Sequence, residues 1–276
     1  ASLVVYHNGD PMEILPSYFF PSPVEGFPTS WMDRAVEVDP YYGIDYGKAP
    51  LSVAVDLSNR NKLFGHADIK LAASLNADNS AVEVSSSVTF PYDLEDSKFA
   101  VEYILVANGL TGEGSDWEQS NNYSGSDSGD MNLKPFEEAA NPVPGLKFND
   151  VAVMTSQIGA IEGSLPAAIK ADETINASYE FVLAGALNTE GEPVIQDVNN
   201  LYVVAMVINT ETGEVVNAIK VPVNAYDPSG ITTLKNVGVG TVTERYNAAG
   251  QRITAPQKGL NILKLSNGNT IKVIVK

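Results

Sequence analysis

The chain has 276 residues, of which 44% are hydrophobic and 18% charged, so it is too apolar to be disordered and long enough for two or more domains. Its 34 Asp and Glu outnumber its 17 Lys and Arg, and the net charge of -17 excludes nucleic acid and anionic membrane surfaces as favoured partners. The absence of cysteine excludes disulfides, thiolate metal sites and cysteine nucleophiles.

The N-terminal region begins with an apolar run. Residues 2–7 (SLVVYH) show no alternation, which predicts a buried strand, and the turn-forming NGDP stretch that follows ends it. Four prolines between residues 16 and 28 predict an irregular segment, because proline cannot continue a helix. Residues 29–38 are then expected to extend as a strand.

Half-buried strands are expected from residue 51 onward, because apolar and polar residues alternate between clusters of turn-forming residues. They cover residues 51–57, 67–71, 82–88, 99–106, 178–183, 201–208 and 214–221. The last two are joined by residues 209–213 (NTETG), which is typical of a hairpin turn. The sequence therefore predicts a mainly β fold, with one antiparallel β-sandwich over residues 49–228 and a long insertion after residue 109.

The last part of the chain differs in charge. Residues 231–276 contain seven Lys and Arg against the single Glu244. Two hairpins are expected there, one joining residues 239–246 to 251–253 and one joining 260–265 to 270–275. The change in composition predicts a boundary near residues 227–230 and a small C-terminal β-module over residues 229–276.

A candidate cis-proline turn lies at Phe27, Pro28 and Thr29, because an aromatic residue before proline favours the cis bond. The alternative is a turn that merely starts a strand. This turn belongs to a set of segments that resembles the outer-membrane-protein twenty-eight-related (Omp28-related) family of Bacteroidetes: YHNGDPM at 6–12, GFPT at 26–29, DR at 33–34, EGSLP at 162–166 and VVAMVI at 203–208.

The resemblance implies a partial thioredoxin-like α/β region over residues 1–48 that precedes the β-domain. It also implies that residues 29–34 form a strand beside residues 3–6, and that the protein resides at the cell envelope. At the other end, residues 246–252 (YNAAGQR), 259–262 (GLNI) and 268–276 (GNTIKVIVK) resemble the C-terminal sorting-type domain of proteins exported to the surface of Bacteroidetes.

Two candidate sites fall in polar segments. Asp116, Glu118, Asp127 and Asp130 are candidates for a calcium site, although their spacing lacks the known Ca²⁺-loop pattern, and a solvated mobile loop is the alternative. Flat aromatic side chains give contact area at low entropic cost, so five of them are candidates for binding a partner, the alternative being that they cover a domain junction. They are Tyr41, Tyr42, Tyr46, Trp117 and Tyr123.

Catalytic motifs are missing from the sequence: there is no G-x-S-x-G and no Walker or dinucleotide glycine pattern, and His7 and His66 are expected to be turn or junction residues. No apolar run approaches the ~20 residues that span a bilayer. We expect a non-catalytic protein of the cell envelope, outer-membrane associated or extracellular, that binds a protein or glycan through its sandwich loops. No cofactor besides calcium is expected, and the oligomeric state stays open. The alternative is a thiol-disulfide oxidoreductase-like protein whose cysteine-containing half lies upstream of Ala1.

Overall fold

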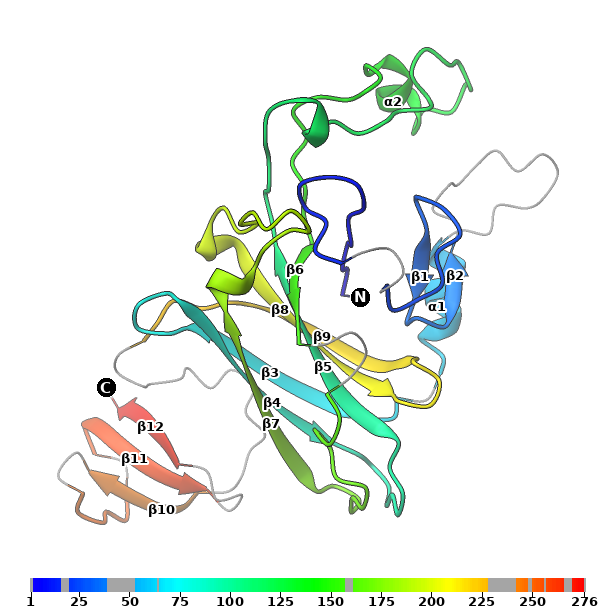
Figure 1. Cartoon of the computed structure of the whole chain (residues 1–276). Helices are drawn as coiled ribbons and strands as arrows, with labels where there is room; N and C mark the ends of the chain where they lie inside the picture. The colour runs from blue at the N-terminus through cyan, green and yellow to red at the C-terminus, as the bar shows by residue number, and fades with distance from the viewer. Residues whose placement is uncertain are drawn as a thin grey trace.

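The computed structural model describes residues 2–15, 20–38, 53–63, 65–156, 161–227, 242–247, 250–255, 257–265 and 270–275. They form a mainly β protein with antiparallel sheets (Figure 1), as expected from the sequence. Its strands are β1 (Ser30–Met32), β2 (Val36–Val38), β3 (Asp68–Leu75), β4 (Ala81–Thr89), β5 (Phe99–Ala107), β6 (Val151–Thr155), β7 (Thr174–Val182), β8 (Leu201–Asn209), β9 (Val215–Pro222), β10 (Val242–Asn247), β11 (Gly259–Leu265) and β12 (Thr270–Val275). The helices are α1 (Val53–Arg60) and α2 (Lys134–Glu138).

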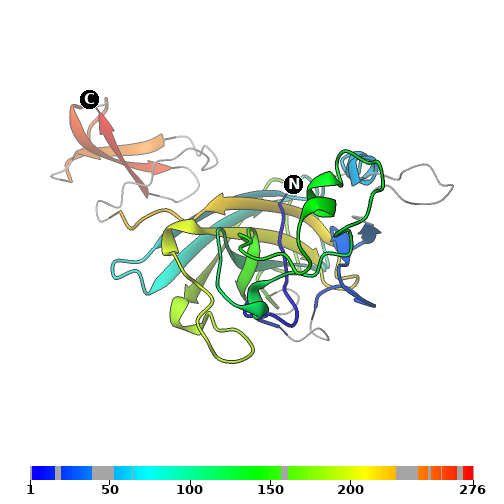
Figure 2. The ribbon, with the colours of Figure 1, turned by 90° about the horizontal axis from the view of Figure 1, so that it is seen from above.

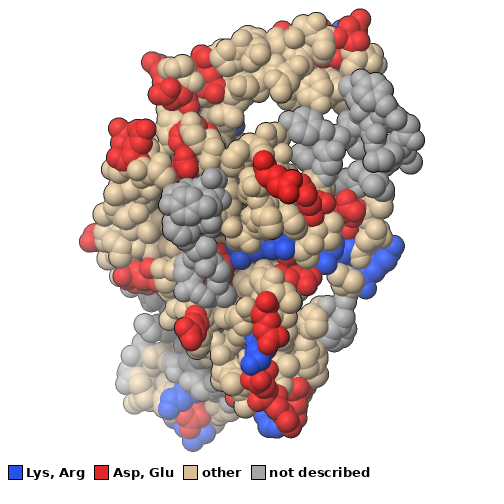
Figure 3. Space-filling model, turned by 45° about the vertical axis from the view of Figure 1, so that its right-hand side comes forward, with Lys and Arg blue, Asp and Glu red and all other residues tan. Residues whose placement is uncertain are grey.

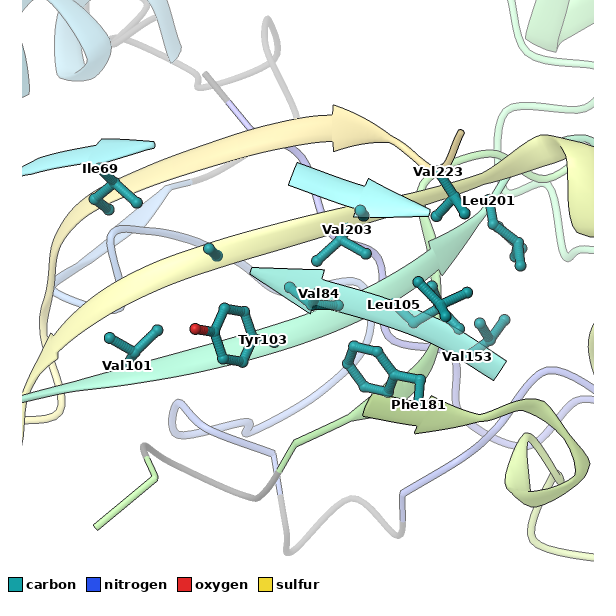
Figure 4. Close-up of a cluster of buried hydrophobic side chains, with 14 of the residues drawn as sticks. Ile69, Val84, Val101, Tyr103, Leu105, Val153, Phe181, Leu201, Val203 and Val223 are labelled. Atoms are coloured by element: carbon teal, nitrogen blue, oxygen red, sulfur yellow. The ribbon is translucent and has the colours of Figure 1, made fainter. Parts of the chain in front are cut away.

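Two sheets pack face to face and enclose the main core. One has the strand order β6-β5-β8-β9 and the other β3-β4-β7, with antiparallel neighbours throughout. Leu105 on β5 and Phe181 on β7 point toward one another across this interior (Figure 4), and both are almost completely buried. The hydroxyl groups of Tyr103 and Ser86 lie 2.6 Å apart and join the two sheets through the core.

One side of the sandwich is closed by backbone hydrogen bonds between the sheets. Leu75 N–H donates to the Asn224 carbonyl oxygen (2.8 Å), and Asn224 N–H donates to the carbonyl of Ala73 (2.9 Å). The Asn217 side chain adds a bond from Nδ2 to the carbonyl of Ala67 (2.6 Å). The β3 edge is therefore tied to the segment that contains and follows β9.

The outer face of the four-stranded sheet is also buried. Ile104, Val106, Val204 and Ile208 belong to a second apolar cluster on that face, and Val4, Tyr6 and Ile14 pack against it. This double burial explains why β8 is a continuous apolar run and why β5 is apolar except at Glu102, where the sequence was expected to alternate.

The expected buried strand at residues 2–7 is wrong, because Val5 alone pairs with the sheet. Val5 N–H donates to the carbonyl of Asp150 (2.8 Å), Ala152 N–H donates to the Val5 carbonyl (2.9 Å), and Leu3 is 60% exposed. The apolar residues of this segment cover a sheet and do not form a strand inside one.

The expected pairing of residues 29–34 with residues 3–6 is also wrong. β1 pairs with β2, and the connection bends through Asp33 and Arg34, whose φ angles of 52° and 56° are those of the tight turns that join hairpin strands. The Phe27–Pro28 peptide bond is cis, and the Thr29 hydroxyl donates to the carbonyl of Gly26 (2.6 Å).

A buried ion pair fastens this hairpin to the outer face of the sheet. Arg34 Nη1 and Nη2 donate to the two carboxylate oxygens of Glu102 (2.8 and 3.0 Å), and the Glu102 side chain is only 1% exposed. Burial raises the pKa of Glu102, and the hydrogen bonds from Arg34 oppose that shift. The two-pronged geometry, with an arginine that is always charged, holds Glu102 as a carboxylate.

Residues 51–57 were expected as a strand, but residues 53–60 form helix α1 instead. Tertiary contacts at its last turn override the alternating pattern: Arg60 Nε donates to Asp33 Oδ2 (2.8 Å) and Arg60 Nη2 to Glu214 Oε1 (2.5 Å). Asp56 in the first turn and Arg60 in the last also complement the helix dipole.

The C-terminal strands form a separate three-stranded sheet of order β10-β11-β12 (Figure 2). The expected pairing of residues 260–265 with 270–275 is confirmed. The other expected hairpin is reduced to one bridge between Tyr246 and Arg252, because β10 pairs along its length with β11. Among the described residues, no helix combines the length and apolar character needed to cross a membrane.

Candidate functional site

The long insertion projects from the sandwich between β5 and β6 (Figure 1). We call residues 111–147 the arm. At its base, the backbone groups of Leu110 and Phe148 bond each other in both directions (3.0 and 2.9 Å). Farther out, Gln119 and Val143 do the same (3.3 and 2.8 Å). The two legs of the arm are thus hydrogen-bonded to each other and do not form an open loop.

Trp117 packs into the root of the arm. Its ring centre lies 6.3 Å from that of Phe148, which is itself packed against the main core. Gly112 also lies against the indole, since a Cβ atom added there would come within 2.2 Å of its ring. The root is joined to the sandwich by Gln196, whose side chain bonds Thr111 N–H (3.1 Å) and carbonyl (2.7 Å).

Replacing Gly112 by alanine should displace the indole, because the new methyl group would overlap its ring. We expect a cost of about 1–3 kcal/mol and a red shift of Trp117 fluorescence, measured in a Trp31→Phe background that leaves Trp117 as the one tryptophan. Gly65→Ala is the matched control, since a methyl group at residue 65 meets nothing within 4 Å. Equal spectra and stabilities for the two variants would contradict this packing.

The outer end of the arm, which we call the head (residues 121–140), is held together by polar side chains. The buried Asn121 donates from Nδ2 to the carbonyls of Phe136 (2.7 Å) and Ala140 (3.2 Å). Glu137, only 8% exposed, accepts hydrogen bonds from Ser128 N–H (2.7 Å) and Oγ (2.6 Å). These bonds fix the head without an apolar core of its own.

The Glu137 carboxylate makes the order of the head depend on pH. Hydrogen bonds from the Ser128 hydroxyl and N–H hold the pKa of Glu137 below its ordinary value. Its stabilising effect is therefore complete above the ordinary glutamate pKa of about 4.3 and is lost as the pH falls through the lower folded-state value. We expect the Ser128 amide to lose protection against hydrogen exchange in that acidic range. Glu137→Gln, which keeps the acceptor oxygen, should remove this pH dependence; an unchanged profile would contradict the role of Glu137.

The head exposes two large apolar side chains, Met131 (82%) and Phe136 (54%). Sequence reasoning missed both, although an apolar pair inside an interval rich in Ser, Asn and Asp was the signal that could have revealed them. The arm carries seven Asp and Glu against Lys134 and Lys147. Acidic side chains lie at both ends of the arm, which is at the top of the view in Figure 3. The two exposed apolar side chains therefore belong to an arm that is acidic overall.

The calcium candidates are not brought together. Among the described residues, no three His, Asp or Glu side chains are grouped so that they could hold a metal ion. Asp130 Oδ1 accepts from Asn132 N–H (2.8 Å), and Asp116 Oδ1 from the Ser115 hydroxyl (3.2 Å), so each serves its own local turn.

The remaining candidates are dispersed. Tyr123 lies half-buried in the head, whereas Tyr41, Tyr42 and Tyr46 lie outside the described residues. His7 Nδ1 lies 2.6 Å from Asp10 Oδ2, and its ring meets Phe148 edge-on at 5.3 Å, beside the root of the arm.

No protein-family model and no curated protein matches the chain. Among solved structures, HBP35 of Porphyromonas gingivalis has 15% identity and a TM-score of 0.44, over 92% of this chain and 77% of that chain. A domain of the outer membrane lipoprotein Omp28 from Porphyromonas gingivalis has 13% identity and a TM-score of 0.27, over 60% of this chain and 93% of that one. Both are distant in sequence and superpose loosely.

Proposed function

We propose that this chain is a non-enzymatic binding protein of the cell envelope and that the arm contacts its partner, a protein. The observation that carries the proposal is the exposure of Met131 and Phe136 on a head that hydrogen bonds hold in one shape. A rigid projection loses little conformational entropy on binding, so its apolar tip can contribute most of its burial energy to affinity.

The chemistry of the arm defines the partner. Phe136 and Met131 require an apolar pocket, and a buried aromatic anchor of this kind commonly dominates an interface. The acidic side chains around them favour a basic rim on the partner, which would also speed association. A glycan is disfavoured as the ligand of Trp117, because Phe148 and Gly112 lie against its ring.

The envelope location rests on two sequence resemblances, that of residues 6–34 and 162–208 to the Omp28-related family and that of residues 246–276 to sorting-type tails. Fractionation of the source cells tests it: the protein should be recovered with the envelope or the medium. Recovery of the full protein in the cytoplasm would overturn this part of the proposal.

Site-specific photo-crosslinking tests the contact surface. A photoreactive side chain at position 131 should give one dominant adduct with an envelope protein, and Phe136→Ser should suppress it. The same group at Leu187, which is 41% exposed in the connection between β7 and β8, is the matched control. Adducts of equal yield from both positions, or none from position 131, would count against the arm as the contact surface.

A further inference from the structure

In the described part of the chain, one long backbone edge of the sandwich, that of β7, has no partner strand. It lies at the end of the sheet β3-β4-β7, and its nine residues pair with β4 without a register shift. On its other side, no backbone group of β7 bonds any described residue. A free row of N–H and C=O groups is a template for another strand.

The residues that present these groups follow from the ladder. Leu183 N–H donates to the carbonyl of Ser80 (2.9 Å), so odd-numbered residues of β7 direct their backbone groups toward β4. The even-numbered residues direct theirs outward: Thr174, Asn176, Ser178, Glu180 and Val182. The same alternation occurs on β3, where the backbone groups of Ala73 and Leu75 point away from β4 and form hydrogen bonds with the backbone of Asn224.

The other edges of the sandwich are covered. β3 is tied to Asn224 beyond β9, and β6 is short and bridged by Val5. β7 lacks three of the features that protect natural edges, since it contains no proline, no lysine and no bulge, and Glu180 is its one charged side chain. Beside residues 176–178 lies a hollow of about 270 Å³, whose other walls are Tyr103 and residues 161–164.

We propose that β7 pairs with β7 of a second copy of this chain, antiparallel and centred on Ser178. The partner needs a free edge of equal length with outward groups on alternate residues, and a second copy supplies that edge by symmetry. This register places Ser178 opposite its own copy, Asn176 opposite Glu180 and Thr174 opposite Val182. The two strands then form about ten backbone hydrogen bonds.

The side chains suit this register. Glu180 lies opposite Glu83 within the sheet, so β7 already carries a like-charge pair on this face. In the dimer each Glu180 faces the amide of Asn176, which donates hydrogen bonds, and no two carboxylates meet across the new interface.

The net charge of residues 1–230 determines how the proposed dimer responds to salt. Residues 1–230 contain 33 Asp and Glu against ten Lys and Arg, so two copies repel each other at low ionic strength. Salt screens this repulsion and leaves the backbone hydrogen bonds in place. The dimer should therefore strengthen as salt rises, the reverse of an interface built on ion pairs.

Sedimentation of the full chain, over about 10–200 µM and from about 0.02 to 0.3 M salt, tests the proposal. We expect a dimer that dissociates at low salt and at low concentration. Ser178→Pro removes an outward N–H at the centre of the interface, a position where an edge strand tolerates proline, and should weaken the dimer at least about tenfold. Ser178→Ala keeps the N–H and should behave as the unmodified chain.

A second variant guards against misfolding of the proline variant. Asn176→Glu places a carboxylate opposite Glu180 of the other copy and should also weaken the dimer, whereas Asn122→Glu adds the same charge at an exposed residue of the arm and should not. In the dimer, the amides of residues 176, 178 and 180 should gain concentration-dependent protection against hydrogen exchange. A monomer at the highest concentration and salt, or Asn176→Glu dimerising as well as Asn122→Glu, would overturn the proposal.

Discussion

Replacement of Arg34 by methionine should lower the free energy of unfolding by about 3–5 kcal/mol, because it leaves the carboxylate of Glu102 buried without its partner. Glu102 is 1% exposed as a side chain, and Arg34 supplies its two short hydrogen bonds, with Thr155 Oγ1 adding a longer one at 3.3 Å. Denaturant unfolding followed by circular dichroism measures the loss.

The double variant Arg34→Met, Glu102→Leu tests whether the single variant loses stability because one charge is left buried and unpaired. Removing both charges avoids their desolvation cost, so this variant should regain most of the stability lost by Arg34→Met alone. If the single and double variants are equally unstable, the ion pair is not what fastens the β1–β2 hairpin to the sheet.

Leu105→Ala should cost about 2–5 kcal/mol, because it opens a cavity between the two sheets. Leu105 is fully buried at the centre of the main core, near Val153 and Phe181 (Figure 4). Thermal or denaturant unfolding measures the change.

Leu187→Ala is the matched control for Leu105→Ala, since the same atoms are removed from a side chain that is 41% exposed. We expect a change within about 0.5 kcal/mol for it. Comparable losses for the two variants would mean that Leu105 does not lie in a packed interior.

Local patterns were enough to predict the sandwich strands other than β6. The β8–β9 hairpin follows from two apolar segments around a turn in which Asn209 Oδ1 accepts from Glu211 N–H (2.9 Å). The interaction is local, so a single sequence contains it. β3, β4 and β7 were likewise predicted from alternation, which they show because only one of their faces meets the core.

Elements fixed by distant contacts were missed or mistaken. Helix α1 was expected as a strand because its ion pairs through Arg60 reach Asp33 and Glu214, which no local pattern contains. The five-residue β6 was missed, since such a short apolar run carries no periodicity of its own.

The arm shows the same limit at the candidate site. Its polar composition favoured a solvated loop. However, the Asn121 side chain donates hydrogen bonds to carbonyl groups 15 and 19 residues away, and the Glu137 carboxylate accepts hydrogen bonds from a serine nine residues before it. Composition does not reveal such pairings. Trp117 was expected at a partner surface or a junction, and the structure places it in the root of the arm against Phe148.

The contact surface is tested most directly by purifying the crosslinked partner and measuring its affinity for the full chain and for variants of the arm. Titration calorimetry should show that Met131→Ser with Phe136→Ser weakens binding at least about tenfold, or 1.4 kcal/mol, while the thermal midpoint stays unchanged. Leu187→Ser, in the connection between β7 and β8, should bind as the unmodified chain does. Unchanged affinity of the Met131, Phe136 double variant would contradict the role of the arm as the binding element.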